Sequence, residues 1–124
     1  MSQLIINLII ITTVFLIIIF VLRIIKYLIK KKKQKIINEK IIIFQNNIDK
    51  ANSNNKRAMY FLSNNYLNGE ETEVNYIAAF YWAYKAESLG YKKATKLRKL
   101  IENKITVEQK AAAILKIENE LIKS

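Results

Sequence analysis

Residues 58–94 read AMYFLSNNYLNGEETEVNYIAAFYWAYKAESLGYKKA, and this stretch determines the fold that we expect. Its small and apolar residues recur at the spacing of an α-helix, first before Gly69 and again before Gly90. Alanines allow two helices to approach closely, and the larger rings fill the remaining space as core residues. We predict a helix hairpin with two facing stripes: Ala58, Leu62 and Tyr66 in the first helix, and Ala79, Trp82, Ala86 and Leu89 in the second.

The same helical spacing continues outward from this hairpin. The chain of 124 residues contains no Pro and two Gly, which disfavours the many tight turns of an all-β fold. Local chemistry marks the helix ends: an Asn-rich turn at residues 52–55, Gly69 and Gly90 at C′ positions, and a capping box formed by Thr106 and Gln109. An all-α fold follows, with helices predicted at residues 36–50, 55–68, 74–89, 91–104 and 106–122.

The spacing in residues 58–94 resembles the Sel-one-like repeat, a relative of the tetratricopeptide repeat. That repeat reads A-x-x-x-L-G-x-x-Y-x-x-G, then a short loop, then A-x-x-W-Y-x-x-A-A-x-x-G-x-x-x-A. Nine positions of the chain agree with it in residue type and spacing: Ala58, Leu62, Tyr66, Gly69, Ala79, Trp82, Ala86, Gly90 and Ala94. The chain departs from the repeat at Ser63, Glu71, Ala83 and Glu87.

The resemblance implies a short α/α solenoid of tetratricopeptide-like helix hairpins that binds proteins and uses no cofactor. Phe44, Ala51 and Asn54 stand where a preceding repeat would place its aromatic residue, its small residue and its closing glycine. Residues 94–105 resemble the first helix of a following repeat, and the end of the chain is similar to a terminal capping helix. One hairpin cannot bury its apolar face alone, so the flanking helices are expected to stack on it.

The face of the first helix opposite its core stripe is the predicted partner-binding surface. In such arrays the first helices line a concave face, where Tyr supplies rigid contact area and Asn supplies adaptable hydrogen bonds. The predicted residues are Tyr60, Asn64, Leu67 and Asn68, extended by Tyr81 and Tyr84 of the second helix. The alternative is that Tyr60 and Leu67 only pack on a neighbouring helix.

Toward the N-terminus the composition changes to an uncharged apolar run, Leu4 to Leu22. Sixteen of its 19 residues are Leu, Ile, Val or Phe. As a helix the run would measure about 28 Å, close to the hydrocarbon thickness of a bilayer. The hydroxyls of Thr12 and Thr13 are expected to bond back to carbonyls one turn earlier. Met1, Ser2 and Gln3 supply no basic n-region, and no small-residue cleavage site follows, so we interpret residues 1–29 as a retained transmembrane anchor rather than a signal peptide.

Most of the formal net charge of +11 lies immediately after this run. The basic residues there are Arg23, Lys26, Lys30, Lys31, Lys32, Lys33 and Lys35. We interpret residues 30–35 as a juxtamembrane polybasic segment that contacts anionic headgroups of the lipid bilayer, in preference to a nucleic-acid patch, because it lacks interleaved aromatic residues. The positive-inside rule then predicts a single-pass protein of a bacterial inner membrane, with its N-terminus outside and residues 36–124, the helical-repeat domain, in the cytoplasm.

A second basic cluster follows Gly90. Lys92, Lys93, Lys96, Arg98 and Lys99 occur with no acidic residue between Ser88 and Leu100. We interpret the cluster as a solvated helix face. The alternative is contact with the anionic leaflet or with an acidic partner.

Catalysis is not expected. The chain has no His and no Cys, and its one Asp is Asp49, so the usual acid–base and nucleophilic groups are missing. Glu70, Glu71 and Glu73 lack the spacing of a calcium loop, and neither a metal nor a small-molecule substrate is expected. Two functions remain: an adaptor that holds a protein partner near the membrane, or a structural subunit held in a larger complex by its transmembrane helix. A third alternative, a small membrane-active or toxin-like peptide with a helical tail, is disfavoured by the repeat pattern of that tail.

Overall fold

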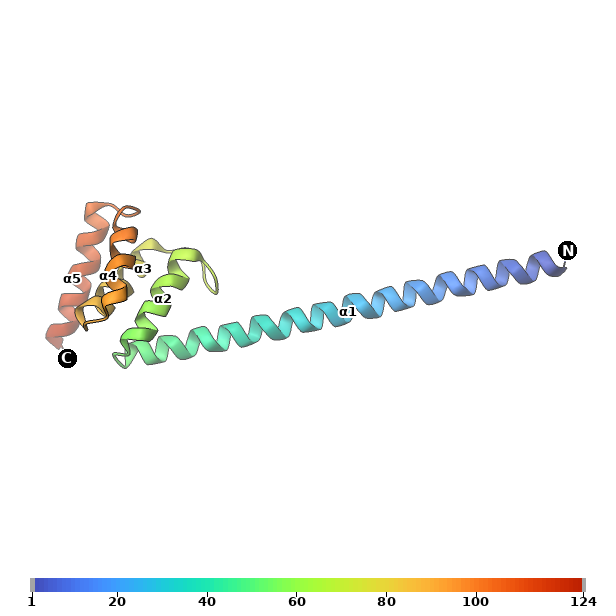
Figure 1. The fold of residues 1–124 in the computed structure, drawn as a ribbon, viewed down its shortest axis with the longest axis horizontal. Coiled ribbons are helices and arrows are strands. Elements are labelled where there is room, and N and C mark those ends of the chain that lie inside the picture. Colours follow the sequence, from blue (N-terminus) through green and yellow to red (C-terminus); the bar gives the residue numbers. More distant parts are fainter. Residues whose placement is uncertain (1, 124) are drawn as a thin grey trace. The chain divides into compact units, whose positions relative to one another are not determined.

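The computed structural model describes residues 2–123, in which α-helices joined by short turns and loops are present and no strand occurs (Figure 1). It contains five α-helices: α1 (Ser2–Asn52), α2 (Lys56–Asn68), α3 (Tyr76–Ser88), α4 (Lys92–Glu102) and α5 (Val107–Lys123). The last four agree with the predicted helices to within two residues at each end. The all-α fold class is therefore confirmed for the described residues.

The first helix differs from the prediction. Residues 36–50 do not form a helix of their own but are the end of α1, which continues without a break from Ser2 to Asn52. The polybasic segment 30–35 lies within this helix. The physical reason is that residues 23–50 contain no Gly or Pro, and lysine is a good helix former.

The chain divides into two units between Glu39 and Lys40. The first unit consists of the apolar and basic parts of α1, and the second contains the end of α1 together with α2 to α5. The sequence placed the start of the helical domain at residue 36, close to this division. The outermost residues of the predicted domains, Met1 and Ser124, lie outside the described residues.

The helix ends use the caps that the sequence predicted. Asn54 has a φ of 64°, and the Asn55 side chain accepts hydrogen bonds from the first backbone N–H groups of α2. Gly69 (φ 69°) and Gly90 (φ 81°) are left-handed, as expected at C′ positions. The Thr106 and Gln109 capping box is present, with hydrogen bonds of 3.0 and 3.2 Å between each side chain and the other residue's N–H.

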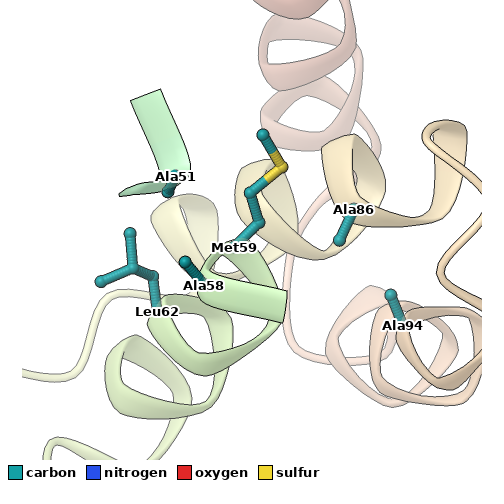
Figure 2. Packing of buried hydrophobic residues seen from close by; sticks show 6 residues of the cluster. All are labelled: Ala51, Ala58, Met59, Leu62, Ala86 and Ala94. Carbon is teal, nitrogen blue, oxygen red and sulfur yellow. The ribbon is translucent and has the colours of Figure 1, made fainter. Parts of the chain in front are cut away.

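The core of the second unit is built on α3, which packs against α2, α4 and α5, while α2 also contacts α4. Seven of its buried residues are alanines: Ala51, Ala58, Ala79, Ala83, Ala86, Ala94 and Ala113. In Figure 2, Ala86 of α3 and Ala94 of α4 point toward one another, with Met59 of α2 beside them. These short side chains let the helix backbones approach closely, as the stripe pattern predicted.

Ser63 shows how close α2 and α3 come. The sequence has Ser there instead of the Gly of the repeat, and its side chain is completely buried. The hydroxyl donates a 2.7 Å hydrogen bond to the backbone carbonyl of Ala79 on the facing helix. A small side chain is therefore kept at the crossing, and its polar atom is satisfied across the interface.

Two core predictions need correction. Trp82 is half-buried and packs against the edge of the core, whereas Phe80, which the stripe omitted, has no exposed surface. Leu89 is 40% exposed. The reason is that α3 ends at Ser88, so the helical periodicity that placed Leu89 in the core no longer applies to it.

Candidate protein-binding and membrane-binding surfaces

The first unit presents apolar side chains with nothing packed on them. From Leu4 to Leu22 every large apolar side chain is exposed, by between 37% at Ile19 and 72% at Leu4. Thr12 and Thr13 donate 2.9 Å hydrogen bonds to the carbonyls of Ile9 and Ile10, which confirms the prediction that their hydroxyls are satisfied within the helix. The helix is long and apolar enough to span a membrane.

All seven basic side chains after this run are exposed on α1: Arg23, Lys26, Lys30, Lys31, Lys32, Lys33 and Lys35. Within residues 2–123, only Lys35 among them has an ion-pair partner, Glu39 at 3.9 Å, and this pair is also exposed. Because a pair at that distance in solvent contributes little, the positive charge of the segment is available to an external anion.

The predicted partner surface on α2 is only partly free. Tyr60 contacts the ring of Tyr91 edge to face, with ring centroids 5.3 Å apart, and packs against the core of the second unit. Asn64 donates a 3.0 Å hydrogen bond to the carbonyl of Tyr60, and Leu67 packs against the core. Asn68 is exposed. The structure thus places these four residues on one helix face, but Tyr60 and Leu67 pack against other parts of the fold, and Asn64 is hydrogen-bonded within α2.

The two tyrosines of α3 that were predicted to extend this surface, Tyr81 and Tyr84, contact different parts of the domain. Tyr84 packs against Phe80, with ring centroids 5.9 Å apart. Tyr81 donates a hydrogen bond to the carboxylate of Glu120 on α5. Burial, followed by this hydrogen bond, raises the pKa of Tyr81, and the same bond lowers the pKa of Glu120. Tyr81 is therefore a neutral donor that holds α5 against α3.

A groove lies beside Tyr60, between α2 and α4, and we call it the α2–α4 groove. Its volume is about 550 Å³, and it is lined by Tyr60, Lys92, Lys93, Lys96, Leu97 and Leu100. Three lysines of the second basic cluster, Lys92, Lys93 and Lys96, thus share this groove with the predicted partner residue Tyr60. Sequence reasoning identified both but missed their juxtaposition, because only the stacking of α4 beside α2 brings them together.

A second groove of about 510 Å³, the α3–α5 groove, is lined mainly by aromatic and polar side chains: Asn52, Tyr66, Asn75, Ile77, Ala78, Tyr81, Trp82, Ala113, Lys116 and Glu120. Its charged groups are engaged internally. Glu120 also pairs with Lys85 at 3.2 Å, and the ammonium groups of Lys85 and Lys116 lie over the ring of Tyr81. The α5 residues of this groove had no distinctive sequence signal.

Arg98 belongs to a different surface from the lysines of its cluster. It bridges Glu87 of α3 and Glu102 of its own helix, and Lys110 of α5 lies 2.6 Å from the same Glu102 carboxylate. The hydrogen bond from Arg98 lowers the pKa of Glu87, and the one from Lys110 lowers the pKa of Glu102. The departure of Glu87 from the repeat pattern thus has a structural role: it ties α4 to α3.

Within residues 2–123, no group of three or more acidic side chains is placed to hold a metal ion. In the loop after α2, Glu71 pairs with Lys40 at 3.8 Å, whereas Glu70 and Glu73 are exposed. The surfaces described above offer shape, apolar contact and charge.

Comparisons with known proteins yield no relative. No family model, no curated protein and no solved structure matches the chain.

Proposed function

We propose that the protein is a membrane-anchored adaptor that binds another protein through its helical domain. The observation that carries the proposal is the pair of open grooves on the second unit, lined with aromatic, apolar and charged side chains. Tyr, Trp and Leu beside charged groups are typical of protein recognition. The affinity expected of so shallow a surface is on the order of micromolar.

The anchor in this proposal is the apolar part of α1. Leaving its exposed side chains in water would be unfavourable, whereas a bilayer accommodates them. The length of the apolar run, rather than of α1 as a whole, suits the hydrocarbon core. The exposed basic residues from Arg23 to Lys35 would contact anionic headgroups, and the positive-inside rule would keep the helical domain in the cytoplasm of a bacterial cell with the N-terminus outside.

The helical domain is proposed to be a short solenoid related to the Sel-one-like repeat. The contacts of α3 with α2, α4 and α5, and of α2 with α4, support a stack of helices centred on α3. Buried Ala51 and left-handed Asn54 fit the closing positions of a preceding repeat, and Phe44 packs edge to face on Tyr66, with centroids 5.9 Å apart.

The second candidate function is a structural subunit of a larger membrane complex. One observation favours it: the apolar side chains of α1 are free to pack against other transmembrane helices as well as lipid. The two functions differ in which part of the chain carries the binding energy for the partner.

Replacement of the apolar run distinguishes the two functions. Residues 4–22 are exchanged for an unrelated apolar sequence of the same length, and both full-length chains are purified from membranes in mild detergent. An adaptor is expected to capture the same partner in similar amounts with either span, because the helical domain is unchanged. If the partner disappears when the span is replaced, the adaptor proposal is wrong and the structural subunit is favoured. Equal amounts of the two chains in the membrane fraction serve as the control.

A further inference from the structure

We infer that the α2–α4 groove binds an acidic peptide segment that also carries apolar side chains. The inference rests on the proposed adaptor function and specifies the chemistry of the partner. It is carried by the arrangement of charge in the groove, by its apolar floor and by its concave shape.

The charge of the groove is uncompensated. Among residues 2–123, no carboxylate lies within 4.0 Å of the ammonium groups of Lys92, Lys93 or Lys96. The acidic residues nearest in sequence, Glu87 and Glu102, are held by Arg98 on another face of the domain. Three like charges on one helix face repel one another, so an external anionic ligand would relieve that repulsion as well as gain attraction.

The same contacts fix the position of the lysines. Arg98 and Glu102 connect α4 to α3 and α5, while Leu97 and Ala94 of α4 are buried in the core. Lys92, Lys93 and Lys96 therefore project from a helix that is held in place on its opposite side. Binding does not require α4 to become ordered, which lowers the entropy cost of association.

The groove also offers apolar contact between the lysines. Leu100 is 53% exposed, and the ring of Tyr60 is braced against Tyr91. Residues 2–123 supply no hydrogen-bond partner for the Tyr60 hydroxyl. A ligand that carries only charged groups would leave this apolar surface exposed to water. A segment with Leu or a similar residue among its acidic residues would cover it.

The concave shape favours a peptide over a membrane surface. A bilayer presents headgroups over a broad plane, whereas the side chains of a peptide fit between Tyr60 and the α4 residues that line this shallow, open groove. The volume of about 550 Å³ accommodates a few side chains of a short helix or an extended segment.

The test uses the full chain in nanodiscs of zwitterionic lipid and measures fluorescence anisotropy of a labelled synthetic peptide of alternating Glu and Leu residues. The groove variant is Lys92→Gln with Lys93→Gln and Lys96→Gln. Its matched control, Lys99→Gln with Lys104→Gln and Lys123→Gln, removes equal charge from exposed positions that do not line the groove. The groove variant is expected to bind the peptide about tenfold more weakly, and the control within about twofold of the parent.

Two further arms separate specific binding from charge alone. A peptide with Gln in place of Glu is expected to lose most of its binding, and Leu100→Ser is expected to weaken the acidic peptide without altering the emission of Trp82, the only tryptophan of the chain. Equal weakening by the groove variant and its control, or no weakening by either, would overturn the inference. So would a Leu100→Ser chain that binds with unchanged affinity.

The membrane alternative is an outcome of the same test. In that outcome the parent does not bind the acidic peptide but binds phosphatidylserine vesicles. If the groove variant loses vesicle binding while the control keeps it, the lysines bind a lipid surface and the peptide inference is wrong. Failure here is distinguishable from failure of the adaptor proposal. If the chain does not bind the peptide but still captures its partner after replacement of the apolar run, it is an adaptor that uses a different binding surface.

Discussion

Replacing Ile11 and Leu16 by lysine is expected to move the chain from the membrane fraction to the aqueous or aggregated fraction. Both residues lie near the middle of the apolar run and are 65% and 63% exposed. The 16 apolar residues of the run favour insertion by roughly 5 to 10 kcal/mol in total, whereas two central lysines cost about 5 to 7 kcal/mol and also remove two favourable residues. The two contributions then nearly cancel, so the strong preference for a spanning helix is lost. Alkaline carbonate extraction of membranes measures the result.

The matched control is Ile41→Lys with Ile42→Lys, two exposed isoleucines of the same helix that follow the polybasic segment. This variant is expected to remain in the membrane fraction, because the apolar run is intact. If the Ile11→Lys and Leu16→Lys chain also resists extraction, the run does not act as a transmembrane anchor.

The second large effect concerns the core of the helical domain. Phe80→Ala removes the largest side chain that is fully buried and is expected to destabilise the domain by about 3 to 5 kcal/mol. A domain of this size has a stability of about 5 kcal/mol or somewhat more, so the variant should be largely unfolded or on the edge of unfolding. The emission of Trp82, which borders the core, reports unfolding by urea in the intact chain in detergent.

Tyr76→Ala provides the comparison, because it removes an aromatic ring from the same helix at a position that is 37% exposed. Its expected loss is about 1 kcal/mol or less, including the contact of its ring with Lys104. Equal urea midpoints for the Phe80→Ala chain and the parent would show that α3 packs with a different face inward.

The sequence predicted the helix ends best because their chemistry is local. Gly69 and Gly90 end their helices by adopting a positive φ, and Thr106 caps its helix by accepting a hydrogen bond from the backbone N–H of Gln109, three residues later. These interactions do not depend on the rest of the fold. The alanine stripes of α2 and α3 were likewise visible as helical spacing. Residues 36–50 were predicted as a separate helix because composition changes there, although no residue in that region stops a helix.

The remaining differences depend on neighbours that a sequence pattern does not specify. Phe80 rather than Trp82 fills the core because α3 has partners on several sides, so a single stripe underestimates its buried surface. Arg98 belongs to the lysine cluster by its place in the sequence, but in the fold it pairs with Glu87 of another helix. The α2–α4 groove could not be predicted for the same reason: Tyr60 and Lys96 are far apart in sequence, and helix stacking brings them together.

The most direct test of a membrane-anchored binding domain is site-specific photo-crosslinking of the full chain in membranes of its native host. A photoreactive residue is placed at Lys96 in the α2–α4 groove, at Ile77 in the α3–α5 groove, and at Lys99, which lines neither groove. We expect a crosslinked adduct with another protein in the membrane fraction from the Lys96 position and none from the Lys99 position. Equal adducts from all three positions, or none from either groove, would contradict a protein-binding role for this domain.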